Sequence, residues 1–152
     1  MSRMQTLQTL LEREQARRDE AQSALQDALR QAQAALAQEN SLVDYRGDYC
    51  KRWAGQFAQS GAIEILRCYQ GFVERLDQAI GAQAGQVRAS ERAVEATRQL
   101  LLQREMRLAT VERLMQRHAH QQKLLLDRRE QKNIDEMAMR RRPASAMAPQ
   151  QA

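Results

Sequence analysis

The side chains in this sequence that could bind a metal or act as nucleophiles are two histidines and two cysteines. His118 and His120 are two positions apart and point to different sides of a helix, whereas a helical pair of metal ligands needs a spacing of three or four. Cys50 and Cys68 lack a histidine or further cysteines that would complete a tetrahedral site. We therefore expect free thiols, no metal or other cofactor, and no enzymatic activity.

The composition is that of long helices. Charged residues make up 28% of the chain and aromatic residues only 4%, and both prolines follow residue 142. Acidic residues are interspersed among the basic ones, so the net charge of +5 is a weak signal for an acidic partner. A mean hydropathy of −0.73, with no long apolar run and no signal-like N-terminus, predicts a cytosolic protein without a transmembrane helix.

A heptad pattern dominates the second half of the chain. A seven-residue step keeps an apolar residue in eight consecutive heptads, as a coiled-coil seam requires, at Leu66, Val73, Ile80, Val87, Val94, Leu101, Leu108 and Met115. Only three of the eight companion positions, three residues further on, are apolar, which predicts a narrow, two-stranded seam. These positions are Tyr69, Leu76, Gln83, Ser90, Thr97, Arg104, Val111 and His118.

The first half carries a weaker version of the same pattern. Its apolar seam residues are Met4, Leu7, Leu11, Ala21, Leu25, Ala28, Ala32, Ala35, Leu42, Tyr49 and Trp53. Glu14, Arg18, Glu39 and Arg46 interrupt it. A second stripe at Leu29, Leu36 and Val43 lies one step round the helix, so a drift of the register is an open alternative there.

The two patterns predict an all-α fold in which two long helices form an antiparallel coiled-coil hairpin. We expect one domain over 1–142, with helices over about 3–58 and 62–139, a turn at 59–61 and a disordered tail at 143–152. In the turn, Ser60 is expected to cap the second helix and Gly61 to adopt backbone angles closed to other residues. Met4 then lies opposite the region from Met115 to His118, and the rest of the longer second helix projects without a partner.

Two surfaces are candidates for binding another protein. Tyr45, Ile65, Phe72 and Ala79 make one flank of the seam apolar, where a two-stranded coil usually carries charge. Alternatively, the aromatic residues here only thicken a small core around the turn. The projecting segment, about 117–139, combines leucines with charges of both signs, which suits either a solvated helix or insertion into a groove or pore of a partner.

Particular residues resemble the flagellar FliJ family of small antiparallel coiled-coil proteins. Those before and after the turn are Tyr45, Tyr49, Trp53, Tyr69, Gly71, Phe72, Leu76, Ala79 and Ile80, and the run over 129–138 (REQKNIDEMA) is a second signature. The resemblance implies a stalk of the type III export apparatus whose partners are the export ATPase FliI, the export gate protein FlhA and export chaperones. It also implies a cytoplasmic location, peripherally associated with the inner face of the membrane.

By the same resemblance, the gate-binding patch consists of Gln38, Leu42, Tyr45, Tyr49, Phe72, Leu76 and Ala79. The expected contacts with the ATPase ring are Leu125, Arg128, Arg129 and Lys132. Where this chain has Gln83, the family usually has a histidine.

Three alternatives remain for a helical hairpin of this kind. One is the related stalk of a virulence type III secretion system. Another is a basic scaffold that binds nucleic acid, which the interleaved Asp and Glu disfavour, so no nucleic acid is expected as a partner. A plain structural spacer is the third.

Overall fold

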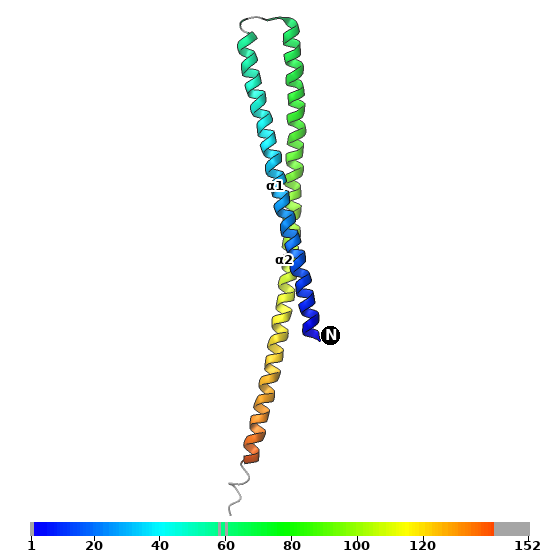
Figure 1. Cartoon of the computed structure of the whole chain (residues 1–152), viewed down its shortest axis with the longest axis vertical. Helices are drawn as coiled ribbons and strands as arrows, with labels where there is room; N and C mark the ends of the chain where they lie inside the picture. The colour runs from blue at the N-terminus through cyan, green and yellow to red at the C-terminus, as the bar shows by residue number, and fades with distance from the viewer. Residues whose placement is uncertain (1, 58, 60, 142–152) are drawn as a thin grey trace, which may run out of the picture. The chain divides into compact units, whose positions relative to one another are not determined.

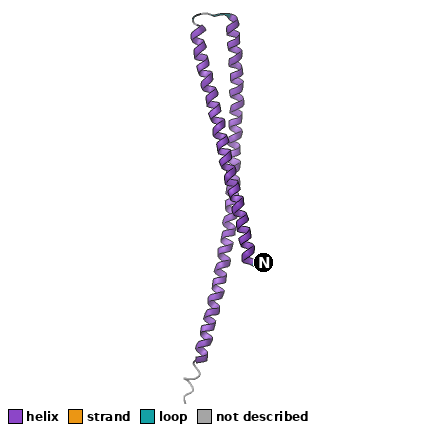
Figure 2. Ribbon diagram, viewed as in Figure 1, coloured by secondary structure: helices purple, strands orange, loops and turns teal. Residues whose placement is uncertain are grey.

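The computed structural model describes residues 2–57, 59 and 61–141. It contains helix α1, Arg3–Phe57, and helix α2, Ile63–Arg141, and no strand occurs in the described ranges (Figures 1 and 2). The two long helices pack against each other, which confirms the predicted all-α hairpin. The expected cap at Ser60 and the expected tail at 143–152 lie outside the described residues.

The structure divides into two compact units. One unit is 16–105, in which the α1 and α2 parts lie side by side in opposite directions (Figure 1). Here the Gln83 side-chain amide donates a hydrogen bond to the Ala35 carbonyl at 2.9 Å, so each helix fixes the other's register. The other unit joins 2–15 to 106–141. In it, Arg3 and Leu7 share a surface depression with Arg117 and His118, as the expected pairing of these two helix ends requires.

Local sequence favours the start of α1 and both ends of α2. At the start of α1 the Ser2 hydroxyl accepts from the Gln5 N–H at 3.2 Å, and the Gln5 amide oxygen accepts from the Ser2 N–H at 3.0 Å. This reciprocal capping box satisfies two donors that a helix leaves unpaired. In α2, Glu64 lies in the first turn and Arg140 and Arg141 in the last, which complements the helix dipole at both ends.

The core is the predicted seam. In α2, every seam position from Tyr69 to His118 is buried or half-buried, and from Ala119 to Arg141 every residue is exposed. In α1, the same holds for every seam position from Leu7 to Trp53, including the four charged interruptions. Met4 and Leu66, at 36% and 40% exposed, are the apolar seam residues that stay uncovered.

The register of α1 does not drift. Leu29, Leu36 and Val43 are 38%, 48% and 49% exposed, while Ala28 and Ala35 beside them are buried. The heptad seam of α1 therefore continues through Ala28 and Ala35. Their small side chains allow the two helices to pack closely, so that side chains of α2 cover them. The larger stripe remains on the surface.

The expectation for Gly61 was wrong. No described residue has a positive φ angle, so Gly61 does not use the left-handed conformation that favours glycine. Helix α1 ends at Phe57 and α2 begins at Ile63, and a connection of this length can reverse the chain without a tight left-handed position.

Within the described residues, neither α1 nor α2 contains an apolar stretch that could cross a membrane.

Candidate interaction surfaces

All six aromatic residues of the chain form one cluster near the loop between the helices. Four come from α1 and two from α2, namely Tyr45, Tyr49, Trp53, Phe57, Tyr69 and Phe72. Their spacing of four along α1 and three along α2 places them on one side of each helix. Aromatic rings bury a large apolar area each, and this hairpin has few other large core residues. The cluster therefore contributes much of the buried apolar area.

Tyr49 lies at the centre of this aromatic cluster. Its ring centroid is 4.6 Å from that of Phe72 and 5.7 Å from that of Tyr69, both on α2. It is also 6.3 Å from Tyr45 and 6.1 Å from Trp53 on its own helix. These separations fall in the range at which aromatic pairs attract each other. Tyr49 therefore joins the two helices as well as its neighbours along α1.

The cluster is partly core and partly surface. Tyr45 is 52% exposed, whereas the other five rings are half-buried. Tyr49, Tyr69 and Phe72 thus thicken the core around the turn, whereas Tyr45 presents its ring to solvent. Ile65, on the same flank, is 46% exposed.

The structure brings the seven residues of the expected gate patch to one region of the unit 16–105. Tyr45, Tyr49 and Phe72 contact one another through their rings, with Tyr45 and Phe72 centroids 6.4 Å apart. Leu76 is buried and Leu42 half-buried, while Gln38 and Ala79 are exposed. The surface available to a partner is therefore smaller than the seven residues suggest, and Tyr45 is its most exposed large side chain.

A polar contact crosses the seam at Arg46, one of its charged interruptions in α1. Arg46 Nε and Nη2 donate to the two carboxylate oxygens of Asp77 on α2, the second bond at 3.4 Å, and this hydrogen bonding raises the pKa of Arg46 above its usual value. A hydrogen bond with Cys50 raises the pKa of the Tyr69 hydroxyl above its usual value. Cys50 and Cys68 are both free thiols, and no described group of His, Cys, Asp and Glu could hold a metal ion.

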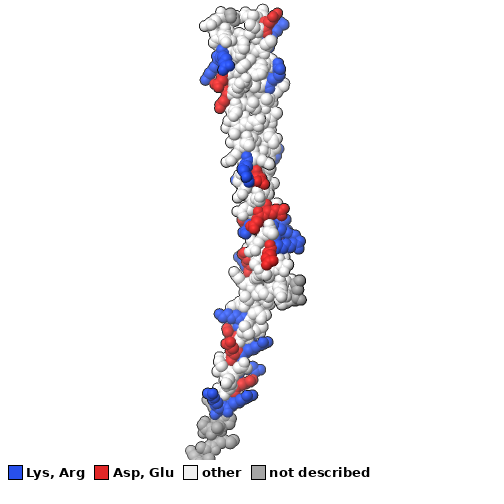
Figure 3. All heavy atoms as spheres, viewed as in Figure 1, with Lys and Arg blue, Asp and Glu red and all other residues white. Residues whose placement is uncertain are grey.

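Next to the gate patch the hairpin has no charge. Residues 31–38 of α1 and 78–87 of α2 contain no Lys, Arg, Asp or Glu, and a pale band without charged atoms is visible on the face shown in Figure 3. Gln38 and Ala79 lie at the ends of these two segments. These segments consist largely of alanine and glutamine, and uncharged groups cost less to remove from water than charged ones.

The expected ring-contact residues share one helical face. Leu125, Arg128, Arg129 and Lys132 follow the i, i+3, i+4, i+7 spacing, and all are exposed. Leu125, 49% exposed, and Arg128 line a shallow depression with Gln121 and Leu124. No residue of α1 covers this face, since α2 is exposed throughout from Ala119.

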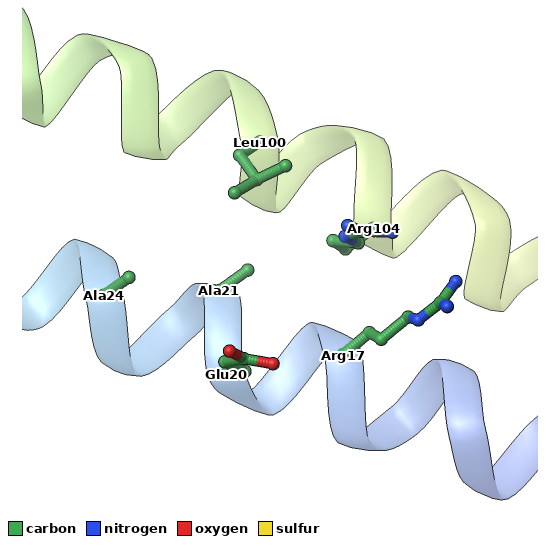
Figure 4. A pocket seen from close by; sticks show the side chains of 6 residues that line it. All are labelled: Arg17, Glu20, Ala21, Ala24, Leu100 and Arg104. Carbon is green, nitrogen blue, oxygen red and sulfur yellow. The ribbon is translucent and has the colours of Figure 1, made fainter.

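A further depression lies between the helices in the unit 16–105. Figure 4 shows Leu100 and Arg104 of α2 reaching towards α1 opposite Ala21, Ala24 and Arg17, with Glu20 beside them. Small alanines facing longer side chains leave this space, about 160 Å³. Its lining combines apolar side chains with two arginines and Glu20.

Two long helices that pack against each other define a helical-hairpin protein, with an apolar patch near the loop and an uncovered helical face. The family model described as flagellar FliJ protein matches residues 4–144, so the chain belongs to the FliJ family. The chain is accordingly a component of flagellar type III protein export. No curated protein and no solved structure is similar enough to match.

Proposed function

We propose that this chain is a non-enzymatic stalk that couples the export ATPase FliI to the export gate protein FlhA. Its uncovered helical face would enter the ATPase ring and promote ring assembly and ATP hydrolysis. Its aromatic patch would engage the gate, and export chaperones are further partners. The chain would then be cytoplasmic and held at the inner face of the membrane through the export apparatus.

The observation that carries this proposal is the uncovered length of α2 from Ala119 to Arg141. A single helix in water is of marginal stability, and this one keeps Leu124, Leu125 and Leu126 at 43%, 49% and 56% exposed. A partner that surrounds or grips the helix would bury these leucines and stabilise it. Membership of the FliJ family supports the export ATPase as that partner.

The experiment measures ATP hydrolysis and ring assembly by the export ATPase of the same organism, with the intact chain and with variants of the exposed face. Leu125→Gln, and the combined change of Arg128, Arg129 and Lys132 to Gln, are expected to lower the stimulation. Ile134→Gln is the matched control, because Ile134 is 59% exposed but lies on the opposite side of the helix from Leu125.

Stimulation by the intact chain that is reduced by the first two variants and kept by Ile134→Gln would support the assigned face. Equal losses in all three would mean that the ring contacts α2 all round. No stimulation by the intact chain would contradict the stalk function.

A further inference from the structure

The seam opens towards the loop and leaves a groove. Leu66 is the first apolar seam residue of α2, yet it is 40% exposed, whereas Leu76 further along the same seam is 8% exposed. On the loop side of the contact between Tyr49 and Phe72, an open groove of about 380 Å³ is lined by Tyr49, Trp53, Glu64, Ile65, Cys68 and Tyr69. Within the unit 16–105, this groove is lined by side chains of both helices, as is the depression beside Leu100.

The rim of this groove adds to its apolar character. Ile63 is 71% exposed and Ile65 46% exposed, next to the uncovered Leu66. Single exposed apolar side chains are ordinary on protein surfaces, but adjacent ones around a concave site are typical of a contact with another protein. Covering these side chains removes apolar surface from water and so favours association.

The groove is continuous with the aromatic patch. Tyr49 lines the groove and also contacts Phe72 and Tyr45 of the patch, with ring centroids 4.6 and 6.3 Å away. A partner that covers Tyr45 therefore reaches the groove within the length of one or two side chains. The patch and the groove can act as a single surface.

The charge of the groove differs from that of the chain. Its lining contains one charged residue, Glu64, while the chain as a whole carries a net charge of +5. In the described part of the chain, Glu64 makes no ion pair. An acidic group beside apolar walls favours a basic side chain on the partner and disfavours an acidic one.

We infer that this groove is an additional part of the gate-binding surface, and that it takes an apolar side chain and a neighbouring Lys or Arg of the gate protein's cytosolic region. The inference rests on the proposed gate function. It adds Trp53, Glu64, Ile65 and Cys68 to the contact surface. It also predicts that the segment of the gate protein that binds here carries a positive charge.

Two cysteines of the chain supply the test. Cys68 lines the groove, whereas Cys50 is not among the lining residues and lies near Tyr69 and Arg46. The intact chain is alkylated with N-ethylmaleimide with and without the cytosolic domain of the gate protein, and the rate at each cysteine is followed by peptide mass spectrometry. Binding is expected to slow the labelling of Cys68 several-fold more than that of Cys50.

A matched pair of charge-reversal variants tests whether the negative charge of Glu64 contributes to gate binding. Glu64→Lys is expected to weaken gate binding by about tenfold, with a larger effect at low salt. Glu74→Lys makes the same change at an exposed position of α2 outside the groove and is expected to leave the affinity unchanged. Circular dichroism checks the helix content, and Glu64→Gln is expected to give a smaller loss in the same direction.

The possible outcomes separate the inference from the proposed function. Gate binding with unchanged labelling of Cys68, or with equal affinities for the two lysine variants, would overturn the groove while the gate function stands. An intact chain that does not bind the gate domain would overturn both.

Discussion

Tyr49 of α1 and Phe72 of α2 have ring centroids 4.6 Å apart, the closest ring contact between the two helices in the described residues. Both residues belong to the expected gate patch, but their contact also holds the helices together. Tyr45 lies next to both rings and is half exposed. The same aromatic cluster therefore serves stability through its inner members and offers a surface through its outer one.

Gate binding and stability should separate at Tyr45 and Leu76. Tyr45→Ala is expected to abolish most of the gate binding and to leave helix content and ATPase stimulation intact, because its ring is 52% exposed. Leu76→Ala should instead lower the free energy of unfolding by about 2–3 kcal/mol, since it removes a buried side chain from a narrow seam.

The control for Tyr45 is Val43→Ala, because Val43 is similarly exposed at 49% but lies on the other flank of α1. Affinity for the gate domain is measured by calorimetry and unfolding by urea. Loss of helix content in Tyr45→Ala, or equal loss of gate binding in Val43→Ala, would contradict the assigned surface.

Gln83 should contribute to stability through one hydrogen bond. Its side-chain amide donates to the Ala35 carbonyl of the other helix at 2.9 Å in a half-buried position. Gln83→Ala is expected to cost about 0.5–1.5 kcal/mol relative to Gln86→Ala. Gln86 is exposed, and the shared change to alanine cancels the difference in helix propensity. Equal unfolding midpoints in urea for the two variants would show that the bond contributes nothing.

The loop glycine should tolerate a side chain. Gly61 has no positive φ angle, and a Cβ atom added there would meet nothing within 4 Å. Gly61→Ala is therefore expected to leave the free energy of unfolding unchanged or to raise it by up to about 1 kcal/mol, through the lower entropy of the unfolded chain. A measured loss of more than about 1 kcal/mol would mean that the glycine is needed for its backbone conformation.

Tyr69 should lose its proton at a higher pH than an ordinary tyrosine. Because the hydrogen bond with Cys50 raises its pKa in the folded state, the folded protein holds this proton more firmly than the unfolded chain does. The resulting stabilisation is complete below the ordinary tyrosine pKa of about 10 and is lost as the pH rises through the folded pKa.

The measurement is a titration of tyrosinate absorbance on the folded protein. Cys50→Ala is expected to move one titration step towards the ordinary value, whereas Cys68→Ala should not move it. A Cys50→Ala curve that overlays the original would contradict the assigned hydrogen bond.

Much of the fold could be predicted from the sequence. The heptads from Val73 to Met115 gave the seam of α2, because a residue every seven positions stays on one side of a two-stranded coil. The loss of apolar seam residues beyond His118 likewise indicated where α2 becomes exposed. The gate patch came from the family resemblance, and its apolar flank was also visible in the pattern itself.

Other features could not be read from the pattern. The sequence offered two stripes in α1, and only the packing against α2 shows that Ala28 and Ala35 are buried while Leu29 and Leu36 are not. The contact between Gln83 and Ala35 and the groove beside Glu64 were also missed. Each depends on the distance between residues far apart in the chain, which periodicity within one helix does not contain.

The sequence by itself determined the class of fold, the seam positions of α2 and the length of uncovered helix, because these follow from periodic burial along a helix with 3.6 residues per turn. Only the tertiary structure decided which stripe of α1 is core, which patch residues remain accessible, and that the seam stays open near Leu66. The physical reason is that side-chain size and the separation of the two backbones determine contact between helices, and both arise when the helices pack together.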